Sequence, residues 1–320
     1  MTTFLEEHAA QVRQAADRIR AHVRRTQSLT TDLDFDLRLK PECFQVTGSF
    51  KVRGAFNAIL ALADQQPRPA GVIAVSSGNH AQAVALAAAA VGLPALVLIP
   101  EDANPAKVAA TRALGAEVIQ EGITFANREQ RLREEMAGRG LTLVHPFDDW
   151  NVIHGQGTAA LEFLEDEPEL RLIVTPVGGG GLLSGTAISA KSHNPAVRVI
   201  GIEPLVADDA YRTWKAGSIQ SLVTAPATLA DGVRTTSIGT RGFEVMFVNR
   251  LVDEIVTVTE EEIAEAVRVA WSRLHLALEP TGALPLAAYL SGKLPKGRTG
   301  LILTGGNANL ETVATLLRTQ

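Results

Sequence analysis

Short apolar runs alternate along the chain with longer stretches rich in Ala, Leu, Glu and Arg. The runs consist of β-branched and aliphatic residues, as buried strands do, and they are Gly71–Val75, Ala95–Ile99, Glu117–Gln120, Leu141–Val144, Leu172–Val177, Val197–Ile202 and Leu301–Thr304. The stretches between them predict helices at Ala81–Val91, Pro105–Leu114, Ala126–Gly138, Gly181–Ser192 and Glu260–Ala277. Because strands and helices alternate, the pattern predicts an α/β fold with mostly parallel sheets flanked by helices.

With 320 residues, the chain is longer than one hydrophobic core usually supports, so we expect two lobes. Two segments rich in turn-forming and polar residues, Gln65–Ala70 and Pro146–Trp150, are the expected linkers. They bound a small domain at 70–147 and leave 1–69 and 148–320 to a large domain. Ligands of such folds bind at the carboxyl ends of the strands, where the loops converge.

Composition and charge exclude several classes of partner. Hydrophobic residues make up 46% of the chain and the formal net charge is -5 without a basic stripe, so we expect no nucleic-acid partner. The longest apolar run, Ala81–Leu98, is interrupted by Gly92 and Pro94, which argues against a membrane span. Cys43 is the only cysteine, which excludes an internal disulfide and suits the reducing cytoplasm.

The loop Ser76–His80, with the sequence SSGNH, follows a predicted strand and precedes a helix. Its hydroxyls, its amide and the free backbone N–H groups of a helix N-terminus favour binding of an anion such as a carboxylate. An ordinary helix cap, with Ser or Asn as the cap residue, explains the same residues.

Four consecutive glycines, Gly178–Gly181, also stand between a predicted strand and a helix. Such a run is entropically unfavourable unless backbone N–H groups must close on a phosphate. A dinucleotide site is the alternative, because Glu203 ends the next strand where a ribose-binding acid is found. The G-x-G-x-x-G spacing is not met, however, since Leu183 or Ser184 stands at its last position.

Two further features are weak on their own. The loop Thr304–Asn307, with the sequence TGGN, is either a second anion site or only a turn. Lys51 stands between Phe50 and Val52 at the start of an expected helix, where desolvation lowers the pKa of an amine and makes it a nucleophile. A lone lysine, however, is usually a solvated surface residue.

The order of these motifs resembles that of a known enzyme group. The segments are GSFKVRGA, SSGNHAQA, GQGT, VGGGGLLSG, EPLVADDA, LADGV, EPTGA and TGGN, and together they extend over nearly the whole chain. The sequence is similar to the threonine ammonia-lyase and serine racemase group of fold type II enzymes, which depend on pyridoxal 5'-phosphate (PLP). The resemblance is specific for fold and cofactor and less specific for substrate. It implies a two-lobed architecture like that of the tryptophan synthase β chain.

The resemblance also implies roles for individual residues. Lys51 would carry PLP and move the Cα proton, with Ser77 as a candidate second acid–base group. Cofactor binding falls to Phe50, Lys51, Asn79, Gly178, Gly179, Gly180, Gly181, Glu279 and Thr304. Substrate binding falls to Ser76, Ser77, Asn79, His80 and Arg128, and a site for Mg²⁺ or Ca²⁺ to Glu203, Ala207 and Asp209. A cap at Ser77, a solvated arginine at Arg128 and a dipole-stabilising acidic cluster at Asp208–Asp209 are the simpler interpretations.

The expected reaction is β-elimination from a small β-hydroxy amino acid, L-threonine or L-serine, to a 2-oxo acid and ammonia. A 3-hydroxyaspartate ammonia-lyase and a serine or aspartate racemase are the alternatives within the group, and a nucleotide-binding protein is the alternative outside it. A hydroxyl at Thr304, unlike a carboxylate, does not force the pyridine nitrogen to stay protonated, which favours loss of a β-leaving group. A homodimer or homotetramer is expected.

Overall fold

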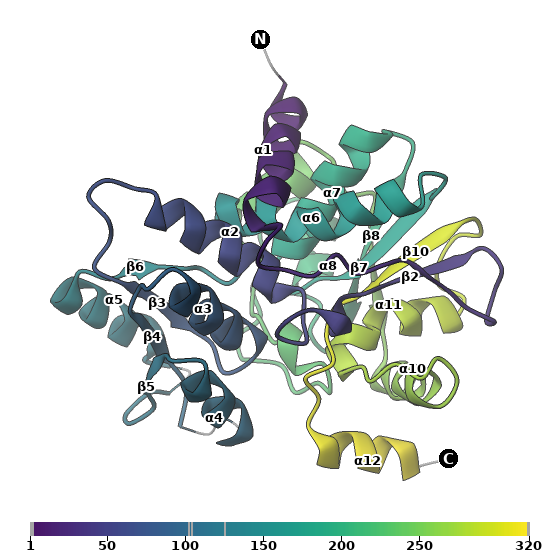
Figure 1. The fold of residues 1–320 in the computed structure, drawn as a ribbon. Helices are drawn as coiled ribbons and strands as arrows, with labels where there is room; N and C mark the ends of the chain where they lie inside the picture. Colours follow the sequence, from purple (N-terminus) through teal and green to yellow (C-terminus); the bar gives the residue numbers. More distant parts are fainter. Residues whose placement is uncertain (1–2, 102, 104, 125, 319–320) are drawn as a thin grey trace.

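The computed structural model describes residues 3–101, 103, 105–124 and 126–318. Within them the chain forms a six-stranded sheet, ordered β1-β2-β10-β7-β8-β9, and a four-stranded sheet, ordered β5-β4-β3-β6. Helices surround both sheets, and Figure 1 shows the smaller sheet beside the larger one. The α/β, mostly parallel architecture predicted from the sequence is therefore confirmed.

The smaller sheet takes all its strands from one continuous part of the chain, and every pairing in it is parallel. Its elements are β3 (Val72–Val75), α3 (Asn79–Ala90), β4 (Ala95–Leu98), α4 (Pro105–Ala113), β5 (Glu117–Ile119), α5 (Arg128–Arg139) and β6 (Thr142–Leu143). Successive side chains of a strand point to opposite faces. Val72 and Ala74 accordingly pack with α3, whereas Ile73 packs with Leu132 of α5.

The larger sheet combines both ends of the chain. Its strands are β1 (Leu29–Thr30), β2 (Leu37–Pro41), β7 (Leu172–Pro176), β8 (Arg198–Pro204), β9 (Glu254–Val258) and β10 (Thr299–Leu303). Only the pairing of β1 with β2 is antiparallel among the strands described. The sheets thus draw on the parts of the sequence expected for two domains, and the domain limits at 70 and 147 stay predictions.

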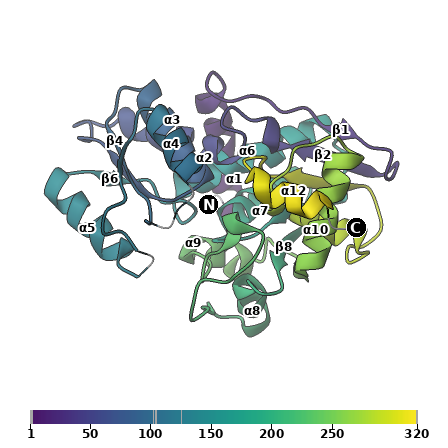
Figure 2. The ribbon, with the colours of Figure 1, turned by 90° about the horizontal axis from the view of Figure 1, so that it is seen from below.

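Helices cover both faces of the larger sheet. The helices outside the segment that forms the smaller sheet are α1 (Phe4–Ile19), α2 (Lys51–Ala63), α6 (Trp150–Asp166), α7 (Gly181–His193), α8 (Asp209–Ala216), α9 (Thr240–Phe243), α10 (Glu260–Ser272), α11 (Pro280–Leu290) and α12 (Leu310–Arg318). Of these, α2 contacts α3 and α6, and α12 contacts α10. One core joins α1, α6 and α7 to the sheet, and a second joins α10 and α11 to its other face. Figure 2 shows α12 over α10, at the opposite end of the molecule from α5.

Glycines of the GQGT and VGGGGLLSG motifs bring three helices into close contact. A Cβ atom at Gly155 of α6 would lie 2.6 Å from the backbone oxygen of Arg53 in α2. A Cβ atom at Gly185 of α7 would lie 2.4 Å from the backbone oxygen of Ile153. Since α2 begins at Lys51, this packing fixes the position of that lysine against the larger sheet.

Arg53 also belongs to a buried ion-pair cluster, formed by Lys40, Glu42, Arg53 and Glu162. The Arg53 guanidinium donates to both oxygens of Glu42 at 2.7 and 2.8 Å, and to Glu162 at 2.9 and 2.8 Å. Lys40 Nζ lies 2.8 Å from Glu162 Oε2. Two positive and two negative side chains therefore neutralise one another beneath α2.

The structure corrects three expectations about local structure. The helix expected at 260–277 ends at Ser272, because the chain turns at His275 (φ 55°) and Leu278 accepts a hydrogen bond from Trp271 Nε1. The second expected linker is partly helical, since Asp149 caps α6 and Trp150 begins it. Strands β2 and β9 were not predicted, and β2 carries the buried residues Arg38 and Lys40.

None of the helices in the described ranges combines the length and the apolar character that a membrane crossing needs.

Candidate active site

A cavity of about 530 Å³ lies between the two sheets and receives loops from both. The loops that follow β3, β7 and β10 converge there with the start of α2. Parallel strands place their carboxyl ends at one edge, so this convergence follows from the topology. Among the predicted site residues, the cavity is lined by Phe50, Lys51, Ser76, Ser77, Asn79, His80, Arg128, Gly178, Gly179, Gly180, Gly181, Glu279 and Thr304.

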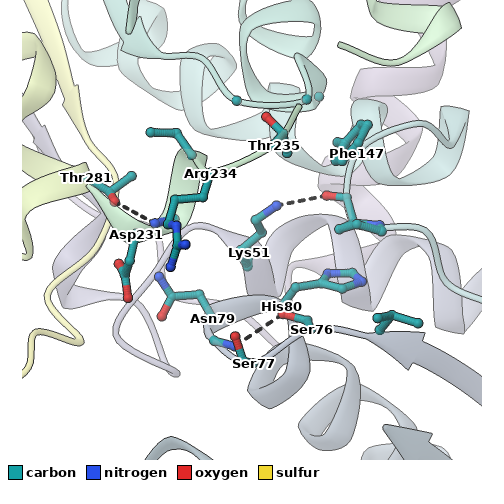
Figure 3. A pocket seen from close by; sticks show the side chains of 18 of the residues that line it. Lys51, Ser76, Ser77, Asn79, His80, Phe147, Asp231, Arg234, Thr235 and Thr281 are labelled. Atoms are coloured by element: carbon teal, nitrogen blue, oxygen red, sulfur yellow. Dashed lines mark hydrogen bonds between the residues drawn. The ribbon is translucent and has the colours of Figure 1, made fainter. Parts of the chain in front are cut away.

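Lys51 is the first residue of α2 and its amine reaches into the cavity (Figure 3). Nζ donates a 2.8 Å hydrogen bond to the backbone oxygen of Pro146 and lies 5.3 Å from the centre of the Phe50 ring. Burial lowers the pKa of Lys51 to about 8. The neutral, nucleophilic fraction of the amine near neutral pH is therefore larger than that of a solvated lysine.

The loop Ser76–His80 opens α3, so its first backbone N–H groups have no carbonyl partner within the helix. Gly78 is the cap residue, and its N–H donates to Ser76 Oγ at 3.3 Å. Ser77 lies at the cavity wall. Hydroxyls and free N–H groups at a helix N-terminus favour an anion such as a carboxylate.

His80 contributes less of its side chain to this site than the sequence suggested. The residue is 2% exposed, and Nε2 lies 2.8 Å from the backbone oxygen of Val144. Since a carbonyl only accepts, Nε2 carries the proton. Burial, with Lys51 nearby, lowers the pKa of His80 to about 3 and keeps it neutral. The imidazole thus attaches the loop to the end of β6, and the backbone N–H remains available to an anion.

The glycine loop leaves no room for side chains. Gly180 has φ 91°, a left-handed conformation that favours glycine. A Cβ atom at Gly179 would lie 2.2 Å from the ring of Phe147, and one at Gly181 would lie 3.0 Å from the Phe147 backbone. The loop also begins α7, so its backbone N–H groups and the helix dipole both favour a phosphate.

Two polar side chains, Thr304 and Glu279, line the cavity on the side of the larger sheet. Thr304 is 2% exposed, and its hydroxyl has no hydrogen-bond partner among the residues described. Such an orphaned buried hydroxyl suits a heterocyclic nitrogen. Glu279 accepts a 2.7 Å hydrogen bond from Asn79 Nδ2, and burial, reinforced by the charge of Asp231, raises the pKa of Glu279 to about 7.

Arg128 begins α5 at the cavity wall and is half-buried. Burial lowers the pKa of its guanidinium, with the charge of Glu129 acting in the opposite direction. It therefore differs from the fully solvated helix arginine that was the simpler interpretation.

Several cavity residues were not identified from the sequence. Figure 3 shows Phe147, Asp231, Arg234, Thr235 and Thr281 around Lys51. Asp231 pairs with Lys107 of α4 and so connects the two sides of the cavity. The motifs LADGV and EPTGA contain two of these residues, but their letters do not show that they meet: Gly232 N donates to Thr281 Oγ1 at 2.9 Å.

The predicted metal residues lie outside the cavity lining, at the end of β8. Glu203 and Asp209 are 0% exposed. Glu203 accepts from the backbone N–H groups of Ala210 and Tyr211, whereas neither Asp209 oxygen has a hydrogen-bond partner in the described ranges. Burial and the charge of Asp209 raise the pKa of Glu203, and burial raises that of Asp209 to about 7. The pair therefore concentrates acidic groups in a buried place without an ion-pair partner of its own among the described residues.

This geometry argues against the dinucleotide alternative. Glu203 turns toward the start of α8 and not toward the glycine loop, so it is not placed to bind a ribose. A buried amine and two helix starts suited to anions around one cavity instead fit the class of enzymes that hold a phosphorylated aldehyde cofactor.

Comparison with known proteins agrees with this class of enzyme. Residues 18–305 match the family "Pyridoxal-phosphate dependent enzyme", and the chain belongs to that family. It is 41% identical over 310 residues to L-threo-3-hydroxyaspartate ammonia-lyase of Saccharomyces cerevisiae, covering 95% of this chain and 94% of the relative. It is 40% identical over 316 residues to serine racemase of Dictyostelium discoideum, covering 96% of each. A solved structure of a threonine deaminase from T.th. is 46% identical, with a TM-score of 0.88 over 94% of this chain and 98% of that one.

Proposed function

We propose that this enzyme eliminates water from a small β-hydroxy amino acid, L-threonine or L-serine, and that a water molecule then hydrolyses the resulting imine, which releases a 2-oxo acid and ammonia. The observation that carries the proposal is the Lys51 amine, with a pKa of about 8, between an anion-binding helix start on each side. The ammonia-lyase and threonine deaminase relatives support the reaction class.

The residues fit PLP, which when bound withdraws electrons from the substrate Cα and so weakens its bond to hydrogen. Lys51 would hold the cofactor through Nζ, and the amine would then take the Cα proton. Backbone N–H groups of the loop Gly178–Gly181 would bind the phosphate. The Thr304 hydroxyl would face the ring nitrogen without forcing it to stay protonated. This keeps electron withdrawal moderate and favours departure of the β-hydroxyl.

The substrate carboxylate would bind at the start of α3, through Ser76 and the free backbone N–H groups. Arg128, which lines the cavity, would favour a second carboxylate. An L-threo-3-hydroxyaspartate ammonia-lyase is therefore the alternative within the same reaction, and two relatives at 41% and 42% identity carry that name.

The test is release of 2-oxo acid from a panel containing L-threonine, L-serine and L-threo-3-hydroxyaspartate. Borohydride reduction followed by mass spectrometry should find the pyridoxyl group on Lys51. Lys51→Ala should abolish turnover and leave the fold intact, because the amine is functional and does not pack in a core. Labelling of another lysine would exclude this assignment.

Racemisation is a second candidate, because Ser77 lies at the cavity wall and serine racemases are among the relatives. Inversion requires an acid–base group on the substrate face opposite Lys51. Chiral analysis of L-serine incubated with wild type and with Ser77→Ala tests it. Loss of D-serine formation with preserved elimination would assign that role to Ser77, and D-serine as the main wild-type product would make the enzyme a racemase.

We also propose a divalent-metal site formed by Glu203, Asp209 and the Ala207 carbonyl. The two Asp209 oxygens have no hydrogen-bond partner in the part of the chain that the structure describes, and they fit a cation. All-oxygen ligands suit Mg²⁺ or Ca²⁺. The described residues contain no group of three His, Cys, Asp or Glu side chains suited to a metal, so the proposed site would use the Ala207 carbonyl as its third ligand.

We also propose that the enzyme is cytoplasmic and forms a homodimer or homotetramer. The single thiol, Cys43, has a pKa raised to about 12 by burial, which makes it a poor nucleophile. Light scattering coupled to size-exclusion chromatography measures the state directly, and a monomer would contradict it.

A further inference from the structure

Asn307, in the loop after β10, makes two hydrogen bonds that join separate parts of the site. Its Nδ2 donates to the backbone oxygen of Thr47 at 2.7 Å and to Asn79 Oδ1 at 2.8 Å. Thr47 lies in the segment leading to Lys51, and Asn79 begins α3 beside the smaller sheet. One amide thus contacts both the lysine loop and the anion loop.

The Thr47 carbonyl determines which atom of the Asn307 amide is the donor. A backbone carbonyl only accepts hydrogen bonds, so the Asn307 atom facing it must be the NH₂ group. The second hydrogen of that NH₂ group points to Asn79, which must therefore offer its oxygen. The opposite face of the Asn79 amide is then its NH₂ group, which donates to Glu279 Oε1 at 2.7 Å.

Glu279 is the last residue in this series of hydrogen bonds, and its carboxylate is held by close contacts with the loop after β10. A Cβ atom at Gly305 would lie 2.4 Å from Glu279 Oε1, so the loop backbone packs directly on that oxygen. The Glu279 N–H donates to the Gly305 carbonyl at 3.1 Å, and Gly306 N–H donates to the Gly48 carbonyl at 2.9 Å. Asn79 is held between two partners that do not move independently, and it lies in the cavity near Lys51 (Figure 3).

We propose that Asn307 is a positioning residue that sets the rotation of the Asn79 amide, so that an N–H and not the carbonyl oxygen faces the ring oxygen of bound PLP. This inference rests on the proposed function. The Asn79 NH₂ group has two hydrogens, and Glu279 uses one. The other remains for an anionic oxygen, which a donor stabilises and a carbonyl oxygen would repel.

Simple packing is the competing explanation. A Cβ atom at Gly48 would lie 2.4 Å from Asn307 Oδ1, so the Asn307 side chain also fills space over that turn, where φ is 73°. A packing role predicts that truncation is more harmful than an isosteric change. The positioning role predicts that the isosteric change is more harmful than truncation. A carboxylate at position 307 can only accept, so it would reverse the direction of the hydrogen bond to Asn79, whereas truncation only removes the preference for one rotation of the Asn79 amide.

The experiment compares Asn307→Asp and Asn307→Ala with Asn309→Asp. Asn309 is two residues away and uses its Oδ1 to accept from the backbone N–H groups of Glu311 and Thr312. A carboxylate does this equally well at the start of a helix, so the control adds the same charge to the same loop without touching Asn79. Two readouts are used: the PLP dissociation constant of apoenzyme, and the ratio of visible to near-ultraviolet absorbance of bound PLP.

For Asn307→Asp we expect the PLP dissociation constant to rise by a factor of about 10 or more, which corresponds to one charge-assisted hydrogen bond. The absorbance ratio should change as well, since it reports on ionisation of the ring oxygen. Asn307→Ala should show a smaller change in both, and Asn309→Asp none.

Wild-type affinity and spectrum in Asn307→Asp would overturn the inference, as would an equal effect of Asn309→Asp or a larger effect of Asn307→Ala. If Asn307→Asp does not fold, an unchanged spectrum in Asn307→Ala overturns it. Failure of the wild type to bind PLP would instead overturn the proposed function, so the two failures are distinguishable.

Discussion

Two groups of buried charged side chains differ in one respect, which is whether the charges are balanced. In the ion-pair cluster, Arg53 donates to Glu42 and Glu162, and Lys40 adds a second positive charge. At the end of β8, Glu203 and Asp209 are equally inaccessible, but neither forms an ion pair within the described ranges, where Arg212 pairs with Asp208 instead. A buried charge is tolerated when it is paired, and otherwise its pKa shifts or a cation binds.

The pKa directions express the same difference. Burial raises the pKa of Glu42, but the Arg53 guanidinium outweighs this and the net pKa is lowered. For Glu203 and Asp209 nothing outweighs burial, and both pKa values are raised. The first group therefore stabilises the fold as it stands, whereas the second would gain a matching charge from a bound cation.

The largest expected effect is that of Arg53→Met. It leaves Glu42 buried without the guanidinium that neutralises it, and with the Thr26 hydroxyl as a remaining donor, so we expect a loss of about 3–5 kcal/mol in the free energy of unfolding. Urea unfolding measures this. Arg53→Lys keeps the positive charge and should lower the free energy of unfolding by less than Arg53→Met does. A smaller loss for Arg53→Met than for Arg53→Lys would show that charge pairing is not what stabilises the cluster.

Metal addition should have the next largest effect. Ca²⁺ or Mg²⁺ at about 100 times its dissociation constant should raise the free energy of unfolding by about 2.7 kcal/mol. Asp209→Asn should abolish the response, whereas Asp208→Asn, the neighbouring acid that pairs with Arg212, should retain it. Chelation followed by titration with each ion provides the measurement, and no response of the wild type to either ion would remove the site.

Acidification should weaken the balanced cluster. The pKa of Glu42 is lower in the folded than in the unfolded state, so its stabilisation is present above the ordinary pKa of 4.5 and is lost as pH falls through the folded value. Each unit of depression corresponds to about 1.4 kcal/mol. Plots of unfolding free energy against pH should be steeper below pH about 5 for wild type than for Glu42→Gln, and parallel plots would contradict the assignment.

The smallest effect is expected at the surface. Arg20 and Asp17 form an ion pair whose side chains are 78% and 72% exposed. Arg20→Met, the same replacement as at Arg53, should leave the free energy of unfolding unchanged within error, because exposed pairs contribute little. A loss comparable to that of Arg53→Met would mean that burial is not what distinguishes these pairs.

Much of the site was accessible from the sequence because loops after parallel strands converge at one edge. The loops Ser76–His80 and Gly178–Gly181 each follow a run that formed the expected strand, and both line the cavity with Lys51. Strand β2 was missed because Arg38 and Lys40 interrupt its apolar pattern. These charges are buried only because Glu167 and Glu162, more than about 100 positions away, neutralise them.

The sequence by itself therefore determined the α/β class, the positions along the chain of the strands that carry the loops, and the residue types in each loop. These depend on local periodicity and on spacing that can be counted along the chain. Only the tertiary structure decided that His80 turns its ring toward Val144, that Asp209 has no hydrogen-bond partner for its carboxylate among the described residues, and that Asn307 donates to Asn79. Each depends on which donor meets which acceptor across distant segments, and hydrogen-bond direction and charge balance are properties of those contacts.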